Sequence, residues 1–464
     1  MPDVAHDPLP AGFLDLLPPD RVLTDPGLMA SYLHDEAEWA DHGSPVAVVR
    51  PRSTAEVAAV VTACARDGVP VVTRGAGTGL SGGANAVQGC VVLCTEHMRD
   101  IVEINQAERL AVVQPGVVND ELRRAVAEHG LWYPPDPASA PWSTIGGNVA
   151  TNAGGLCCVK YGVTRDYVLA LEVVTATGEV VRLGRRTAKG VAGYDLVGLM
   201  VGSEGTLGVV TEVTVRLRPL RTTAPRTVVG FFDTLAAAGD AVSRVTAAGL
   251  QPAAFELIDR VCLRAVNAWK HAGLPEDAAA LLLAQTDLPE PAAQHEAEAI
   301  HAEFTAAGAR EAMLSTDPVE AEALFDARRL AYPALEQLGQ AMLTEDVCLP
   351  RSRLAEMLAR IEAIAAEHDT VIATVAHAGD GNLHPLMLTP HGDEAAKART
   401  RAAFDAIVDA ALEMGGTVTG EHGVGLLKRD GMRRELGPGA LALHRAVKAA
   451  LDPRDILNPG KVLG

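Results

Sequence analysis

The sequence lacks the signals of several common protein classes. It has seven cysteines, none of them in a Cys-x-x-Cys pattern, so it predicts neither a disulfide framework nor an iron–sulfur cluster. No apolar run approaches the roughly 20 residues that span a bilayer. The first residues, MPDVAHDPLP, have no basic region followed by an apolar core, so we expect no secretory signal. These absences favour a reducing, cytoplasmic setting, with any membrane contact made through a partner protein.

Basic residues are also fewer than acidic residues. The chain has 40 lysines and arginines against 59 acidic residues, a net charge of −19, which argues against binding to nucleic acid or to an acidic membrane surface. Hydrophobic residues make up 48% and charged residues 21%, as in a globular protein with a sizeable core. At roughly 150 residues per domain, the length predicts about three units.

The most unusual stretch is PPDPASAPWSTIGGNVATNAGG, residues 134–155. Its prolines fix the backbone, and its two Gly-Gly pairs allow positive φ angles and a close approach to another group. The stretch has too little bulk for a core of its own. Because long glycine-rich loops in compact domains usually serve a function, we interpret it as a wall against a large, flat, polar ligand rather than as a plain surface loop.

A second glycine-rich loop follows an expected βαβ unit. Strands are predicted at 45–51 and 69–75, and a helix between them at 53–68, with Ser53 or Thr54 as its N-cap. The next loop, RGAGTGLSGGA (74–84), formally matches the Gly-x-Gly-x-x-Gly dinucleotide fingerprint, but no helical periodicity follows it. We therefore expect a pyrophosphate cradle built from backbone N–H groups without a helix.

A third such loop, VGSEGTLGVVTE (201–212), completes a strand-rich region over residues 44–221. A helix is predicted at 119–129, capped by Asn119 or Asp120, and a hairpin at 169–183. Taken in order, RGAGTGLSGG, PPDPAS…STIGGNVATNAGG and VGSEGTLGVVTE resemble the FAD-binding domain of the vanillyl-alcohol oxidase and p-cresol methylhydroxylase (PCMH) flavoproteins.

This resemblance implies noncovalent FAD, because the first loop has no histidine or cysteine and the Cys157–Cys158 pair lies past the motif. It also implies three groups of cofactor-binding residues: Arg74, Gly75, Gly77, Thr78, Gly79, Leu80 and Ser81 along the pyrophosphate; Pro135, Asp136, Ser139, Thr144, Gly147, Asn148 and Thr151 beside the ribityl chain and pyrophosphate; and Glu204, Gly208 and Val210 near the adenine side.

The rest of the chain alternates helix and strand after an expected linker, PLRTTAP (219–225). Strands are predicted at 227–233 and 281–287 and helices at 235–249, 259–273 and 289–308, a series that favours an antiparallel sheet covered by helices. The expected fold class is α+β. Its parts are an N-terminal segment (1–43), a PCMH-type FAD-binding domain (44–221) and a C-terminal substrate or cap domain (222–464).

The densest group of metal-ligand residue types lies in this C-terminal part. In HAGDGNLH (377–384) a turn joins two expected strands, so His377 and His384 can converge. GEHG (420–423) adds Glu421 and His422. Two histidines and a glutamate suit a catalytic metal site with an open position, whereas a lone histidine is more often a surface or core residue. His422, with an ordinary pKa near neutrality, is a candidate general base; the alternative is that it only ligates or packs.

Arg328 is a further candidate for chemistry. Helical spacing over residues 320–338 puts it on one stripe with Leu324, Ala331 and Leu335, and a guanidinium on an apolar stripe needs an anion. A substrate carboxylate held by two hydrogen bonds would supply one. Arg329, three residues from Asp326, is expected in a solvated ion pair, although an exchange of roles between the two arginines stays open.

The C-terminal motifs HAGDGNLHP, GEHGVG and DPRDILNPGK (452–461) resemble the FAD-linked D-2-hydroxyacid dehydrogenases, a group that includes glycolate oxidase catalytic subunits and D-lactate and D-2-hydroxyglutarate dehydrogenases. The resemblance implies a divalent metal, Zn or Mn, on His377, His384 and Glu421, with His422 as the base and Asn458 approaching the flavin. Relatives that act on dicarboxylates tend to have a polar residue where Leu386 stands and a lysine where Thr344 stands. Glycolate or D-lactate therefore fits better than 2-hydroxyglutarate.

The resulting hypothesis is an FAD-dependent 2-hydroxyacid dehydrogenase. Arg328 and the metal hold the substrate, His422 takes the hydroxyl proton, and a hydride passes from C2 to flavin N5. With no second dinucleotide fold and no cysteine cluster in evidence, the expected electron acceptor is external: a quinone, a cytochrome, an electron-transfer flavoprotein or an iron–sulfur partner. Two alternatives remain open, a metal-dependent hydrolase and a non-catalytic flavin-binding subunit of a larger complex.

Overall fold

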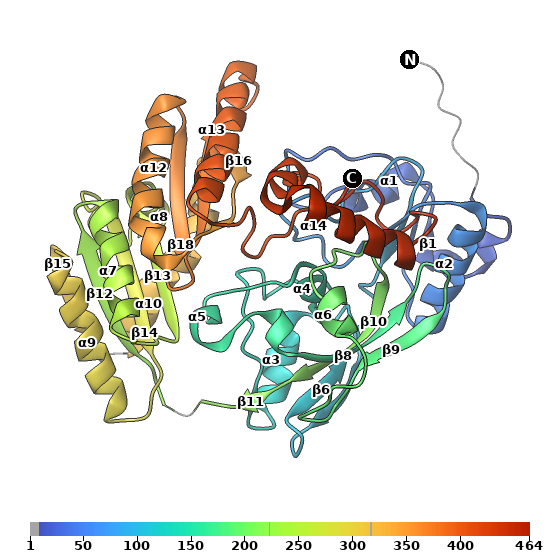
Figure 1. Cartoon of the computed structure of the whole chain (residues 1–464), viewed down its shortest axis with the longest axis horizontal. Helices are drawn as coiled ribbons and strands as arrows, with labels where there is room; N and C mark the ends of the chain where they lie inside the picture. The colour runs from blue at the N-terminus through green and yellow to red at the C-terminus, as the bar shows by residue number, and fades with distance from the viewer. Residues whose placement is uncertain (1–8, 222, 316–317) are drawn as a thin grey trace. The chain divides into compact units, whose positions relative to one another are not determined.

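The computed structural model describes residues 9–221, 223–315 and 318–464 (Figure 1). The chain forms two compact units and passes between them four times. Unit 1 comprises Met1–Gly154, Val163–Leu220 and Glu421–Gly464, and unit 2 comprises Gly155–Gly162 and Arg221–Gly420. The first eight residues of the expected N-terminal segment and residue 222 of the expected linker lie outside the described residues.

Unit 1 contains a four-stranded sheet in the order β1-β2-β4-β3, formed by Val22–Leu23, Ala47–Val49, Val91–Cys94 and Val71–Arg74. Strands β2 and β3 both pair with β4 in parallel, and α2 (Thr54–Asp67) joins them, which confirms the predicted βαβ unit. The predicted ends of α2 are also right. Ser53 Oγ accepts the Glu56 N–H at 3.3 Å, and Gly68 ends the helix with a φ of 72°.

A five-stranded antiparallel sheet is the second layer of unit 1, in the order β5-β6-β10-β8-β9. Its strands are Ile101–Asn105, Leu110–Val113, Val209–Arg216, Val168–Val174 and Val180–Gly184. The predicted hairpin is confirmed as β8–β9, and the helix after β6 is α3 (Asn119–Ala127). The predicted cap of α3 is wrong: Val118 occupies the N-cap position, while Asn119 is buried and bonds to residues far along the chain.

The glycine-rich stretch 134–155 contains a helix that the sequence analysis did not expect. This helix is α4 (Ile145–Thr151), where Thr144 Oγ1 accepts the Gly147 N–H at 3.3 Å. Ile145 and Val149, one turn apart, are buried in the core beside the five-stranded sheet. Since only these two side chains carry bulk, the helical period is too weak to recognise in the sequence. The expectation of a loop is therefore wrong for Ile145–Thr151, and the interpretation of the stretch as a wall against a ligand stays a prediction.

Unit 2 is an antiparallel sheet covered by helices, as predicted, and the helices lie on both of its faces (Figure 1). The strand order is β15-β12-β14-β13-β18-β19-β16, with β17 paired to β19. From β12 to β19 in chain order, the strands are Arg226–Phe232, Ala254–Asp259, Ala280–Thr286, Glu311–Ser315, Ala341–Thr344, Val347–Cys348, Val371–His377 and Asn382–Thr389.

Two sets of helices cover this sheet. Helices α7 (Leu235–Ala247), α9 (Ala292–Ala306), α12 (Leu354–Glu367) and α13 (Glu394–Glu413) pack together, and Phe304 of α9 stacks on Phe255. Helices α8 (Arg260–Lys270), α10 (Pro318–Arg329) and α11 (Ala331–Glu336) enclose a second core with alternate residues of the same strands, among them Ala254 and Ile258. Alternation along the strands thus separates two faces.

The remaining elements are short, apart from α14. They are α1 (Pro26–Met29), α5 (Cys158–Tyr161), α6 (Leu196–Met200), the strand pair β7 (Leu131–Trp132) and β11 (Arg218–Pro219), and α14 (Arg429–Leu451). Helix α1 is followed directly by a 3₁₀ turn at Ala30–Tyr32. After α14 the chain runs beside β3, where the Asn458 N–H donates to the Val71 carbonyl at 2.8 Å. Within the described residues, no helix is long and apolar enough to cross a membrane.

Candidate functional site

The first glycine-rich loop has a run of backbone N–H groups that are available to a ligand. Within the described residues, no backbone N–H from Ala76 to Gly83 donates a hydrogen bond to another part of the chain. A Cβ on Gly75 would overlap Thr144 Oγ1, so the loop lies directly against the second loop. Gly77 has a φ of 80°, in the region that favours glycine. A run of unbonded donors next to a second loop of small residues fits the predicted pyrophosphate cradle.

Both ends of this loop bind the protein itself through their side chains. Arg74 donates from Nη1 to the His34 carbonyl at 2.8 Å and from Nη2 to the Ser31 carbonyl at 3.2 Å. Ser81 Oγ donates to the Gly423 carbonyl at 2.9 Å. The N-terminal segment and the segment after His422 are thus anchored to the loop, a role that the sequence analysis did not foresee for either residue.

The second loop is fixed by a network around Asn148. Asn148 Oδ1 accepts from Asn119 Nδ2 at 2.9 Å, and the same Asn119 amide donates to the Pro135 carbonyl at 3.2 Å. Thr151 Oγ1 donates to the Gly147 carbonyl at 3.3 Å. Pro135 and Asn148 are buried, whereas Asp136, Ser139, Gly147 and Thr151 are half-buried. Asn119, which the sequence analysis took for a helix cap, is the residue that joins α3 to this loop.

Glu204 lies in the third loop and holds a segment of the C-terminal part. Its buried carboxylate accepts the N–H groups of Val424 at 2.7 Å and Gly425 at 2.8 Å. Burial raises the pKa of Glu204 to about 7, although these two N–H groups act to lower it. The carboxylate therefore anchors the backbone just past Glu421 and His422.

Gly208 and Val210, by contrast, serve the packing of the five-stranded sheet. A Cβ on Gly208 would overlap the side chain of Val173, and Val210 lies opposite the same residue in the β8–β10 pair.

Asn458 connects the C-terminal tail to the first and third loops. Its Nδ2 donates to the Gly83 carbonyl at 3.0 Å and to the Glu204 carbonyl at 2.6 Å. Its Oδ1 is buried and makes no hydrogen bond within the described part of the chain. A nearby lysine, Lys461, also donates to the Gly83 carbonyl at 2.8 Å, and burial lowers its pKa to about 8. A buried acceptor without a donor at the point predicted to approach the flavin fits a bound cofactor.

His377 and His384 converge in unit 2, as the hairpin prediction required. In the β18–β19 pair, His377 lies opposite Asn382 and His384 opposite Val375, so both histidines are on one face of the sheet. Their ring centroids are 5.2 Å apart with an interplanar angle of 84°. Both side chains are buried.

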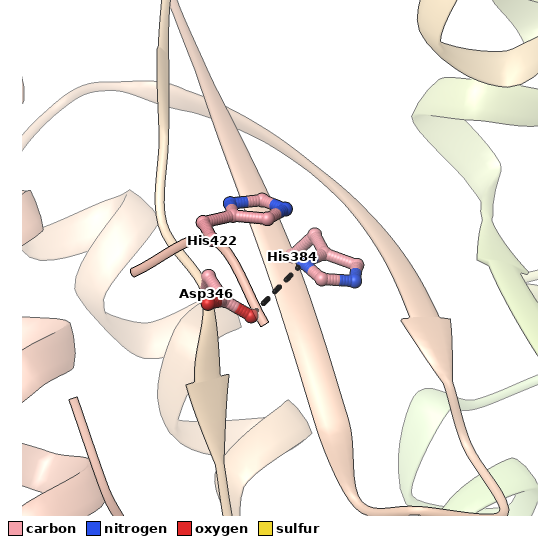
Figure 2. Close-up of side chains that lie close together, drawn as sticks. All are labelled: Asp346, His384 and His422. Carbon is pink, nitrogen blue, oxygen red and sulfur yellow. Dashed lines mark ion pairs between the residues drawn. The ribbon is translucent and has the colours of Figure 1, made fainter. Parts of the chain in front are cut away.

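Each of the two histidines faces a buried carboxylate. Glu256, opposite His377 in the β13–β18 pair, has its two oxygens 2.9 and 3.1 Å from His377 Nδ1. His384 Nδ1 lies 3.5 Å from Asp346 Oδ1 (Figure 2). Ligating histidines usually turn their second nitrogen to such a carboxylate. The sequence analysis missed both carboxylates, although a glutamate inside the apolar strand AFELID was a signal.

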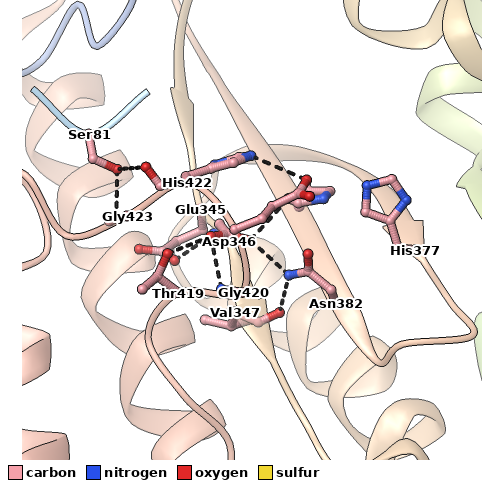
Figure 3. A network of polar contacts seen from close by, with 12 residues as sticks. Ser81, Glu345, Asp346, Val347, His377, Asn382, Thr419, Gly420, His422 and Gly423 are labelled. Carbon is pink, nitrogen blue, oxygen red and sulfur yellow. Dashed lines mark hydrogen bonds and ion pairs between the residues drawn. The ribbon is translucent and has the colours of Figure 1, made fainter. Parts of the chain in front are cut away.

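Asp346 also fixes the chain that leads to Glu421 (Figure 3). It accepts hydrogen bonds from Asn382 Nδ2 and Thr419 Oγ1 at 2.7 Å and from the Gly420 N–H at 2.9 Å. Gly420 is the last residue of unit 2, and Glu421 and His422 are the first residues of the following segment of unit 1. One peptide bond therefore joins the network around Asp346 to the third predicted metal ligand.

Arg328 is buried at the end of α10 and has an anion within the protein. Its Nε lies 2.8 Å from Glu256 Oε2, and the two side chains are 9% and 1% exposed. The sequence analysis offered a substrate carboxylate as the anion that this guanidinium needs, and the structure shows that Glu256 already supplies one. Arg329 is 48% exposed and pairs with Asp326 at 2.9 Å, which confirms the predicted solvated ion pair.

Sequence comparisons identify relatives over most of the chain. Residues 45–184 match the family described as FAD binding domain, and residues 222–462 match FAD linked oxidases, C-terminal domain. The chain is 44% identical over 418 residues to glycolate oxidase subunit GlcD of Bacillus subtilis (strain 168), covering 90% of this chain and 89% of the relative. It is 35% identical over 456 residues to D-lactate dehydrogenase of Anaerostipes hadrus, covering 96% and 95%.

Solved structures show the same fold at low identity. The 4-ethylphenol oxidase from Gulosibacter chungangensis has a TM-score of 0.80 over 97% of this chain and 96% of that one, at 20% identity. For p-cresol methylhydroxylase with substrate bound the TM-score is 0.79, with 97% and 95% covered, again at 20% identity. This likeness confirms the predicted PCMH-type architecture. By its sequence matches and its fold, the chain belongs to the FAD-linked oxidases.

Proposed function

We propose that this FAD-linked oxidase oxidises a small 2-hydroxy acid, D-lactate or glycolate, to the 2-oxo acid, with a divalent metal in the substrate site. The observation that carries the proposal is the His377–His384 pair, in which two buried rings on one face of the sheet each face a buried carboxylate. The similarity to a glycolate oxidase subunit and to a D-lactate dehydrogenase supports this class of substrate.

The proposed metal ligands are His377, His384 and Glu421. With Nδ1 of His377 bonded to Glu256, Nε2 is the nitrogen that faces away from the carboxylate and suits a metal. Glu421 is tethered by one peptide bond to Gly420, which Asp346 holds. Two imidazoles and a carboxylate suit Zn or Mn, and such an ion, when bound, polarises the oxygens of the substrate.

Noncovalent FAD is proposed to lie along the first and second loops and beside Asn458. The unbonded N–H groups of residues 76–83 and the unpaired Asn458 Oδ1 support this placement. When bound, FAD supplies the acceptor of the hydride from the substrate C2. The electrons then leave to an external acceptor: a quinone, a cytochrome, an electron-transfer flavoprotein or an iron–sulfur partner.

The chain's own residues are proposed to orient the substrate and to move one proton. Arg328 offers a guanidinium to the substrate carboxylate, and His422 accepts the proton of the hydroxyl group at C2. Ser81 and Glu204 hold the backbone on the C-terminal side of His422, at the Gly423 carbonyl and the Val424 and Gly425 N–H groups. A base held in this way needs little reorganisation when the proton is transferred.

The surroundings of His384 support a substrate with one carboxylate. Thr344 and Leu386 lie directly opposite each other in the β16–β19 pair, and Leu386 is two residues from His384 on the same face. Both side chains are buried and neither carries a charge. A second carboxylate on the substrate would find no cation at this pair, so D-2-hydroxyglutarate is the less favoured alternative.

The test is the absorbance spectrum of the purified protein under anaerobic conditions, before and after D-lactate, glycolate and D-2-hydroxyglutarate in turn. Bleaching of the flavin band by D-lactate or glycolate is the expected result. Bleaching by D-2-hydroxyglutarate alone would contradict the single-carboxylate assignment. A flavin that none of the acids reduces would favour a non-catalytic subunit, and a protein that takes up no FAD but hydrolyses an ester would favour a hydrolase.

A further inference from the structure

We propose that Glu256 is a positioning residue that couples the metal site to the substrate-carboxylate site. Its single carboxylate contacts both His377, the proposed metal ligand, and Arg328, the proposed carboxylate-binding residue. The inference rests on the proposed function and adds one statement to it: the two sites share a buried anion, so that binding at one changes binding at the other.

The Glu256 carboxylate lies within 3.1 Å of both partners. Oε1 and Oε2 lie 2.9 and 3.1 Å from His377 Nδ1, and Oε2 lies 2.8 Å from Arg328 Nε. The Glu256 side chain is 1% exposed, and those of its two partners are 9% exposed. At such burial solvent screens these contacts little, so a change in the charge of one partner is felt by the other.

Packing alone does not call for a charge at this position. Ala254 and Ile258 flank Glu256 on the same face of β13, and both belong to the hydrophobic core under α8, α10 and α11. An apolar side chain there would continue this core. A carboxylate is instead costly to bury and needs partners. Its two partners are His377, to which the proposed function assigns a metal, and Arg328, to which it assigns a substrate carboxylate.

The carboxylate acts differently on each partner. As the acceptor of the His377 Nδ1–H, it selects the tautomer whose Nε2 lone pair is directed to a metal. As the counter-ion of Arg328, it fixes the guanidinium and offsets part of its charge. A metal bound at His377 draws electron density away from the ring and strengthens the bond to Glu256. The hold of Glu256 on Arg328 then weakens, and Arg328 binds a substrate carboxylate more tightly.

Two variants on the same strand separate this role from mere stability. Glu256→Gln keeps the shape and a hydrogen-bond acceptor but removes the charge. Asp259→Asn is the matched control: Asp259 is also a buried carboxylate of β13, but it accepts its hydrogen bonds from backbone groups, the Cys262 N–H at 2.9 Å and the Thr374 N–H at 2.7 Å. Both substitutions should lower the melting temperature, so stability alone cannot distinguish them.

The experiment measures Zn²⁺ affinity of the full-length, FAD-loaded protein by competition with a chelator, with and without oxamate as a monocarboxylate probe. For the wild type we expect oxamate to tighten Zn²⁺ binding. For E256Q we expect Zn²⁺ binding to weaken roughly 10- to 100-fold, as for other carboxylates behind a ligating histidine, and the effect of oxamate to become smaller. The D259N protein should keep both properties, and flavin content should be equal in all three proteins.

An E256Q protein with wild-type Zn²⁺ affinity and an undiminished oxamate effect would overturn the proposal. If E256Q does not fold, Glu256→Asp decides, because it keeps the charge but is too short to contact both partners; a retained oxamate effect there would equally overturn the proposal. A wild type that binds no Zn²⁺ or Mn²⁺ would remove the metal site and this inference with it. Flavin bleaching by D-lactate would still test the substrate assignment on its own.

Discussion

His422 is the residue on which the proposed proton transfer depends. Replacing it by alanine should leave FAD bound, because the backbone contacts of Gly423, Val424 and Gly425 remain. The rate of flavin reduction by D-lactate should fall by about 10²–10⁴-fold, the usual contribution of a positioned general base. The absorbance spectrum measures the bound FAD, and stopped-flow absorbance measures the rate of flavin reduction. The exposed His391 provides the control substitution, and near-wild-type reduction by H422A would remove the base assignment.

Glu204 gives the protein a pH dependence with a defined sign. Its pKa is raised by burial from 4.5 to about 7, so the folded chain holds more protons than the unfolded chain between these values. The free energy of unfolding contributed by this residue therefore falls as pH rises through this window, by roughly 3 kcal/mol at most. Over the same range the carboxylate form, which accepts the Val424 and Gly425 N–H groups, becomes the populated one.

Glu204→Gln should remove this pH dependence. Urea unfolding of the two FAD-loaded proteins between pH 4.5 and 8 measures it, as the difference between their free energies of unfolding. We expect the free energy of unfolding of the wild type, relative to that of E204Q, to fall as pH rises from 4.5 to 8, because only the wild-type residue loses its proton in this range. Glu108→Gln, at an exposed position, serves as the control. A constant difference across the pH range would show that Glu204 does not titrate there.

At the scale of elements, the β16–β19 pair bears on how many carboxylates the substrate carries. Thr344 lies opposite Leu386, one pleat from His384. A lysine at position 344 would bring a cation to this face, and a charge-assisted contact with a second carboxylate is worth about 1.5–3 kcal/mol. Thr344→Lys should therefore raise the ratio of kcat/KM for D-2-hydroxyglutarate to that for D-lactate by roughly 10- to 100-fold. Thr344→Val is the neutral control, and equal ratios in both variants would contradict the assignment.

Elements with local signals could be predicted from the sequence, and those defined by distant contacts could not. Both ends of α2 follow from Ser53 and Gly68, which act within one turn of the helix. The helix α4 was missed because Ile145 and Val149 become recognisable only when they are packed against the five-stranded sheet. The cap of α3 was wrong because Asn119 finds its partner 29 residues away, at Asn148.

The candidate site divides in the same way. His377 and His384 could be paired from the sequence because a short hairpin brings them together. Their carboxylate partners come from other parts of the chain: Glu256 is 121 residues from His377 in sequence. Arg328 was recognised as a buried cation, but its internal anion was not, since nothing local links α10 to β13. Motifs therefore located the candidate ligands, and the tertiary structure was needed to find the carboxylates that contact them.

For the whole molecule, the four passages between the two units are the feature that the sequence did not indicate. The passage at Leu220–Arg221 agrees with the expected boundary, but 155–162 belongs to unit 2 and 421–464 to unit 1. These assignments depend on contacts between distant segments. One of these contacts is made by Asp287, whose side chain is 2% exposed. It binds Lys160, in the segment 155–162, and Arg221, where the chain enters unit 2 again.

Asp287 joins these segments where they enter and leave unit 2. It accepts hydrogen bonds from Lys160 at 2.5 Å, from the Tyr161 hydroxyl, and from Arg221 at 2.7 Å. Burial raises the pKa of Asp287, but the hydrogen bonds from these three residues outweigh it, so the pKa lies below its ordinary value. The carboxylate is therefore charged at neutral pH and balances two cations.

Asp287→Asn should leave Lys160 and Arg221 without their counter-ion. Removal of one partner from a fully buried pair costs about 3–5 kcal/mol; because Arg221 is 34% exposed, we expect a loss of roughly 2–3 kcal/mol in the free energy of unfolding, measured in urea. Asp233→Asn is the control, since Asp233 is 66% exposed in its pair with Arg310 and should matter little. Limited proteolysis near residues 155–162 should accelerate in D287N alone. Equal stability of the two variants would mean that the segment is held by its packing and not by this carboxylate.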